Sequence, residues 1–81
     1  MQIILSKDED WRVRDAIASK YPIDRSLYEM LSKDKNSIVR GTIAYNKKTP
    51  LDILKRIISE DKEEHIRKNA KENYERRINK N

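Results

Sequence analysis

The chain has 81 residues, 36% of them hydrophobic and 41% charged, with 19 Lys and Arg against 14 Asp and Glu, a net charge of +5. It has no cysteine, one histidine and one glycine, which excludes disulfides, thiolate and multi-histidine metal sites, and glycine-rich phosphate loops. The longest apolar run, residues 3–5, is too short for a membrane span or a signal peptide. We therefore expect one small cytoplasmic domain that binds no cofactor and no membrane.

Three helices are predicted in the first part of the chain. A long helix begins after Glu9 or Asp10, a shorter one begins near Asp24, and a second long one begins at Asn36 or Ser37. Apolar residues recur at helical spacing in each of them. These positions are Val13, Ala16, Ile17, Leu27, Met30, Leu31, Val39, Thr42 and Ile43.

Two more helices are predicted toward the C-terminus. Thr49 suits an N-cap, Pro50 the first helical position, and Asp52 the positive end of the helix dipole. The last helix begins after Lys62 or Glu63. No segment alternates apolar and polar residues long enough to predict a strand, so the fold class is all-α. The apolar stripes are Leu51, Leu54, Ile57 and Ile58 in one helix and Ile66, Ala70, Tyr74 and Ile78 in the other.

An internal repeat is the strongest signal in the sequence. Residues 5–21 and 31–47 are identical at eight of 17 positions, and a third copy begins at Ile58. A unit this short does not bury its apolar face alone, so stacked units share a layer. We predict a single domain, residues 1–81, folded as a short right-handed α-solenoid of about two and a half two-helix repeats, at about 5–30, 31–57 and 58–81.

An aspartate followed six residues later by an arginine recurs in each copy, with Val or Ile directly before the arginine. Each aspartate falls in a turn, where its carboxylate accepts hydrogen bonds from free helical N–H groups. Each arginine reaches that carboxylate, or the one in the neighbouring repeat, with bidentate geometry. We therefore interpret the pairs as a structural ladder rather than as acid–base or phosphate-binding groups. Its members are Asp8, Arg14, Asp34, Arg40, Asp61 and Arg67.

These pairs resemble the Asp…Val-Arg frame of HEAT-like repeats. The short period, the Ile-Ala that follows Val-Arg, Asn46, and Thr49-Pro50 before Leu54 are more similar to the variant leucine-rich repeat. The resemblance covers residues 5–74. It implies helix pairs stacked in a right-handed superhelix, a scaffold that serves many partners. The first copy departs from the frame because it carries Tyr21-Pro22 in place of Thr-Pro.

Successive long helices of such a stack present one common face for binding. Ile38 and Tyr45 are apolar where the other copies carry polar residues, and Gly41 leaves a flat spot between them. The alternative is that both side chains pack against neighbouring repeats. Trp11 is either a core anchor or an exposed contact. The candidate protein-contact face is Trp11, Arg12, Ile38, Gly41, Tyr45, His65 and Lys68.

His65 has no nucleophile or second histidine at a spacing that would indicate catalysis. We therefore expect a non-enzymatic interaction module, and its repeat architecture favours another protein as the partner. Ile3 and Ile4 either fold back on Val13 and Ile17 or join two chains as a homodimer through the N-terminal end.

Nucleic-acid or polyanion binding is the alternative function, because residues 31–81 carry a net charge of +6 against −1 for residues 1–30. Five acidic residues interspersed among the basic ones near the C-terminus weigh against it. The candidate polyanion contacts are Lys47, Lys48, Lys55, Arg56, Lys71, Arg76 and Arg77.

Overall fold

The computed structural model describes residues 10–20 and 23–79, and this part of the chain contains helices but no strand. The prediction of an all-helical fold is confirmed, and each helix begins close to its predicted start. The helices are α2 (Trp11–Ala18), α3 (Arg25–Leu31), α4 (Ser37–Tyr45), α5 (Leu51–Glu60) and α6 (Glu64–Ile78).

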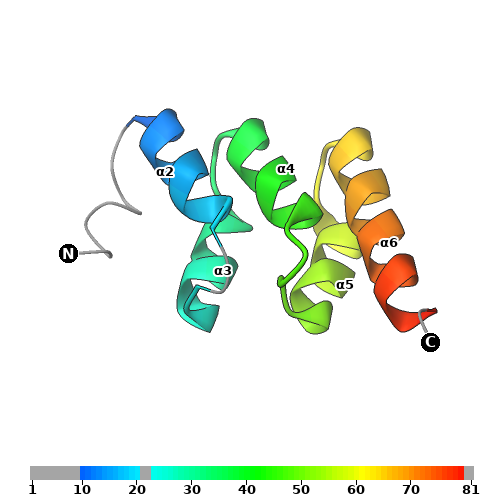
Figure 1. The fold of residues 1–81 in the computed structure, drawn as a ribbon. Helices are drawn as coiled ribbons and strands as arrows, with labels where there is room; N and C mark the ends of the chain where they lie inside the picture. The colour runs from blue at the N-terminus through cyan, green and yellow to red at the C-terminus, as the bar shows by residue number, and fades with distance from the viewer. Residues whose placement is uncertain (1–9, 21–22, 80–81) are drawn as a thin grey trace.

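The helices form two layers (Figure 1). Helices α2, α4 and α6 lie side by side in one layer, and α3 and α5 form the other. Because α3 and α5 run back against the helices of the first layer, the turns that lead into α4 and α6 lie at the same edge of the molecule. The whole measures 37 × 25 × 16 Å.

Side-chain caps fix the starts of α2 and α4. The Asp10 carboxylate accepts a hydrogen bond from the backbone N–H of Arg12 at 2.9 Å, and the Asn36 side chain accepts one from Ile38 at 2.8 Å. Each cap satisfies a first-turn donor that no helical carbonyl reaches. These caps explain why α2 and α4 begin where the sequence predicts.

Thr49 does not cap α5, which corrects the prediction. The N-cap is Pro50, and the helix begins at Leu51. Thr49 is fully buried, and its hydroxyl donates to the carbonyl of Ile43 at 2.7 Å. It thereby gives a carbonyl in the last turn of α4 a second donor, beside the backbone N–H of Asn46 at 3.3 Å.

The core lies between the two layers and takes side chains from all five helices. It differs from the predicted stripes at several places: Ala16, Met30, Leu51 and Ile78 are exposed, whereas Tyr28 is buried. In α2 the buried side includes Arg14, so the inward face is turned relative to the apolar stripe. The core consists of Ile17, Ala18, Leu27, Tyr28, Leu31, Val39, Ile43, Ala44, Ile53, Leu54, Ile57, Ile66 and Ala70.

Two predictions fall outside the described residues, as does Tyr21-Pro22, where the first copy departs from the repeat frame. The two are the part of Asp8 in the ladder and the contact of Ile3 and Ile4, within the chain or between two chains.

Candidate functional site

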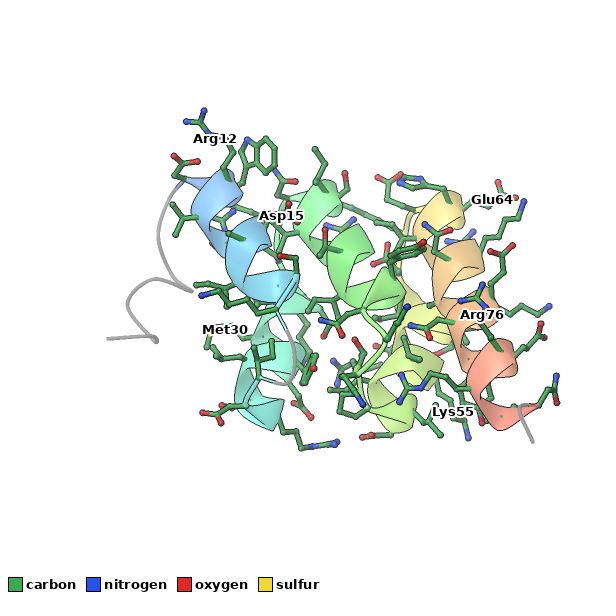
Figure 2. The ribbon with its side chains drawn as sticks, viewed as in Figure 1. Arg12, Asp15, Met30, Lys55, Glu64 and Arg76 are labelled. Atoms are coloured by element: carbon green, nitrogen blue, oxygen red, sulfur yellow. The ribbon has the colours of Figure 1, made fainter. Side chains whose placement is uncertain are left out.

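The layer of α2, α4 and α6 carries most of the predicted contact residues on its outer side. Arg12, Ile38 and His65, which occupy one aligned position in the three repeats, are all exposed. Lys68 is exposed as well. Figure 2 shows Arg12 and Glu64 projecting from the starts of α2 and α6, at one edge of this layer. Charged side chains therefore flank the face at this edge.

Ile38 and Tyr45 are the most exposed large apolar side chains on this layer. Their exposed fractions are 52% for Ile38 and 70% for Tyr45. They lie seven positions apart on α4, which places them on one face of the helix, about two turns from each other. Because α4 is the middle helix of the layer, a molecule bound to them would also meet α2 and α6.

The positions between these exposed residues face neighbouring helices. A side-chain carbon added at Gly41 would point at Ile66 of α6, 3.8 Å from its Cγ1 atom. Asp15 lies on the side of α2 that faces α4 (Figure 2), where it accepts a hydrogen bond from the Thr42 hydroxyl. Trp11, for which the sequence leaves two readings, is half-buried and packs against the core.

Two ladder arginines each reach the aspartate of the next repeat. Arg14 binds Asp34 through two hydrogen bonds, with Nε 2.6 Å from Oδ2 and Nη2 3.0 Å from Oδ1. Arg40 Nε donates to Asp61 Oδ2 at 2.9 Å, and its Nη1 donates to the carbonyl of Asp34 at 2.8 Å. All four side chains are at most 8% exposed. These pairs join the α2 repeat to the turn before α4, and α4 to the turn before α6.

The same aspartates also hold their own turns. Asp34 Oδ1 accepts from the backbone N–H of Asn36 at 2.8 Å, and Asp61 Oδ1 accepts from Glu63 at 2.9 Å. Arg67, the last arginine of the ladder, donates to the carbonyl of Asp61. Each aspartate thus serves a turn and a neighbouring repeat at once.

The seven candidate polyanion contacts fall into two groups. Arg56 and Arg77 are half-buried: Arg56 donates to the Ser32 hydroxyl at 2.7 Å, and Arg77 to the carbonyl of Thr49. The other five are exposed, and the described part of the chain gives them no ion pair. Figure 2 shows two of them, Lys55 on α5 and Arg76 on α6. The exposed group comprises Lys47, Lys48, Lys55, Lys71 and Arg76.

The described residues hold three further ion pairs, all of them exposed, and one joins Arg25 to Glu29 within α3 at 3.7 Å. A side-chain hydrogen bond from Arg25 lowers the pKa of Asp52 below its usual value and raises the pKa of Arg25. This pair links α3 to α5. The corresponding bond between Arg12 and Asp10 lowers the pKa of the Asp10 carboxyl and raises that of Arg12. Water and salt screen such pairs, so they contribute little to stability.

Two asparagines join the repeats, a role that was not predicted from the sequence. The side-chain amide of Asn46 donates to the carbonyls of Ala18 and Lys20, at 2.9 Å each. That of Asn73 donates to Ala44 and to Asn46, also at 2.9 Å. Asn46 and Asn73 stand 27 positions apart, the offset between the second and third copies, so the repeat register itself could have revealed them.

Two open grooves lie near the edges of the layers. One, of about 360 Å³, is formed where the turn after α3 and the turn after α5 come together, and Ser32, Asp34, Arg40 and Asp61 line it. The other, of about 370 Å³, lies between α5 and α6 and is lined by Lys55, Ile58, Lys71, Tyr74, Glu75 and Ile78. Only the first contains buried charged side chains.

The described residues hold no group of three or more His, Asp or Glu side chains placed to bind a metal ion. Within the same ranges, no helix is both long and apolar enough to span a bilayer. No known protein family, curated protein or solved structure matches the chain.

Proposed function

We propose that this protein is a non-enzymatic interaction module that binds another protein on the outer side of the α2, α4 and α6 layer. The observation that carries the proposal is the exposure of Ile38 and Tyr45 on one face of α4. Exposed aromatic and aliphatic side chains inside a polar rim are typical of the centre of a protein–protein interface.

The cross-repeat contacts support the idea of a preorganised surface. Arg14 and Arg40 each fix the position of the next repeat, and Asn46 and Asn73 do the same at the other end of the helices. A surface whose helices are held in register loses little entropy on binding. We propose that these helix pairs form a short right-handed α-solenoid of the variant leucine-rich or HEAT-like kind.

Selection of peptides from a random display library on the immobilised protein would test the contact face. The dissociation constants of selected peptides are then compared between the wild type and the double variant Ile38→Asp/Tyr45→Asp. We expect the double variant to bind at least about tenfold more weakly, since a buried apolar anchor is commonly worth more than 1.4 kcal/mol.

Ile78→Asp is the matched control, because Ile78 is 49% exposed, close to the value for Ile38, but lies at the end of α6. It should bind the selected peptides as the wild type does. Peptides that bind the double variant and the wild type equally well would place the interaction elsewhere and overturn the proposal.

Polyanion binding is the second candidate, favoured by the five exposed basic side chains without an ion pair among the described residues. Fluorescence anisotropy with duplex DNA and single-stranded RNA at several salt concentrations tests it. Electrostatic binding gives a linear fall of log K with log salt, with a slope set by the phosphates neutralised. Charge reversal at Lys47, Lys48 and Lys55 should then reduce the slope, and absence of binding at low salt would exclude this function.

A further inference from the structure

The groove between the turn after α3 and the turn after α5 contains a buried guanidinium with an unused donor. The side chain of Arg40 is 8% exposed, and two of its nitrogens are engaged by Asp61 and by the carbonyl of Asp34. Its third nitrogen, Nη2, is buried and has no hydrogen-bond partner in the part of the chain that the structure describes. Arg40 is also one of the residues that line the groove.

The groove is also positively charged. Five of its ten lining residues are Lys or Arg, and three are Asp or Glu. Two of those three, Asp34 and Asp61, are already paired with Arg14 and Arg40. The remaining basic groups therefore outnumber the one unpaired acid, Glu60. They are Lys33, Lys35, Arg56 and Lys62.

Several donors converge on this space from separate segments. Arg56 reaches it from α5, where it bonds the Ser32 hydroxyl at 2.7 Å, and Lys35 and Lys62 stand in the two turns on either side. A tetrahedral dianion offers several acceptor oxygens to such a set, and arginine forks and lysines recognise it well. A volume of about 360 Å³ accommodates one such group.

We propose that this groove binds a single phosphate monoester group, with Arg40 and Arg56 on its wall and Lys35 and Lys62 closing over it. The group can belong to a small phosphate compound or to a phosphorylated side chain, since both present the same dianion. The site lies in the turns rather than on the exposed residues of α4, so it does not depend on the protein-contact face proposed above.

Titration of the ¹⁵N-labelled protein with inorganic phosphate at constant ionic strength tests the site by NMR. We expect saturable shifts of the backbone amides of residues 32–36 and 60–62, and of the Nε–Hε signals of Arg40 and Arg56. Lys35→Gln/Lys62→Gln should weaken binding by about tenfold or more, because two charges within a few ångströms of the anion are lost. Both lysines are exposed, so the variant keeps its fold.

Lys47→Gln/Lys48→Gln is the matched control, since it removes the same charge from an exposed turn outside the groove. It should retain the wild-type affinity. Equal weakening in both variants would show general charge attraction and overturn the proposal. So would shifts that do not saturate, or equal shifts with sodium acetate at the same ionic strength.

A phosphoserine peptide and its unphosphorylated form distinguish the sources of the phosphate. Tighter binding of the phosphopeptide than of inorganic phosphate, through the same amides, would assign the site to a phosphorylated protein. Equal affinities would assign it to small phosphate compounds. Both results require the phosphate-dependent shifts, and a peptide that binds equally well without its phosphate group would contradict the site.

Discussion

Buried arginines are the unusual residues of this small protein. Arg14 and Arg40 are 5% and 7% exposed, a low value for a charged residue. Each is paired with an equally buried aspartate of the next repeat. Forming such a pair from solvated groups gains little net free energy, but removing one partner leaves a buried charge without compensation. The pairs therefore specify how neighbouring repeats align more than they add to total stability.

Arg40→Ala is expected to destabilise the protein by about 3–5 kcal/mol, because it leaves the buried Asp61 carboxylate unpaired. In a domain of this size this corresponds to a fall in Tm of well over 10 °C. Thermal unfolding followed by circular dichroism measures the change. Arg12→Ala, which removes an exposed arginine paired with Asp10, is the control and should leave Tm nearly unchanged. An unchanged Tm for Arg40→Ala would show that the pair has no structural role.

Tyr28→Phe should be neutral or stabilising at neutral pH. The phenolic oxygen of Tyr28 is buried without a well-formed hydrogen bond among the described residues, and an unpaired buried hydroxyl costs about 1–3 kcal/mol. The substitution removes this oxygen and keeps the ring that packs in the core. Urea unfolding at neutral pH measures the difference. A marked loss of stability would show that the hydroxyl is paired in solution.

Tyr28 also predicts how the stability of the protein changes with pH. Burial raises the pKa of Tyr28 above 10.0, outweighing opposing effects of the Ile23 backbone and the Arg77 charge. Below about pH 10, the unfolded value, the phenol is neutral in both the folded and the unfolded chain, and stability does not depend on its ionisation. Stability falls as the pH rises from there through the higher folded pKa, because the unfolded chain ionises first. Unfolding experiments between about pH 8 and pH 11 should show a steeper fall for the wild type than for Tyr28→Phe.

At the scale of helices, the ends of one repeat are held by side chains of the next. Asn73 lies within α6 and is 4% exposed, yet its amide binds two backbone carbonyls at the end of α4. Helix C-termini leave carbonyls unpaired, and burial makes such groups costly. A side chain of the neighbouring helix thus satisfies carbonyls at the end of α4, a task that capping residues perform in other helices.

Asn73→Ala is expected to cost about 1–3 kcal/mol, because it leaves the carbonyls of Ala44 and Asn46 without this donor. Chemical denaturation measures the loss. Asn79→Ala removes an exposed asparagine at the end of the same helix and should change stability by far less. Equal effects of the two substitutions would mean that the amide bridge contributes nothing.

Gly41→Ala is expected to stabilise the protein by about 0.5–1 kcal/mol, since alanine loses less backbone entropy than glycine within a helix. The added Cβ meets Ile66 Cγ1 at 3.8 Å, an ordinary contact distance. Thermal melts of the two proteins measure the gain. A lower Tm for Gly41→Ala would show that α4 and α6 lie closer together than this distance allows.

For the whole molecule, the helices were predictable because their signals are local. Asp10 and Asn36 are N-cap residues that indicate the starts of α2 and α4 in the sequence. For Ile38 and Tyr45, whose counterparts in the other copies are polar, the sequence left both exposure and packing against neighbouring repeats open, and the structure shows the two side chains exposed. These features depend on neighbours within one or two turns, or on simple alignment of the copies.

Contacts between repeats, such as the Arg–Asp ladder, were predicted from the aligned copies, but the structural consequences of these contacts are not encoded by any local pattern. Arg14 turns inward because Asp34 of the next repeat receives it, and that rotates the buried side of α2 away from its apolar stripe. The groove around Arg40 arises only when two turns 27 positions apart meet at one edge. The sequence predicts Thr49 as the N-cap of α5, but its hydroxyl donates to the carbonyl of Ile43 in α4 instead.

The spacing of the cross-repeat bonds has a consequence for how the protein folds. Among the described residues, the side-chain bonds between repeats join positions 20 to 29 apart in the chain, from Arg14–Asp34 to Asn73–Ala44. Loop-closure entropy depends weakly on length, changing by only about 0.6 kcal/mol for each doubling. The entropic cost of loop closure is therefore nearly the same for each contact between neighbouring repeats, and none of these contacts requires distant ends of the chain to meet. Such low contact order is typical of folding in microseconds to milliseconds, with packing rather than loop closure deciding which junction forms first.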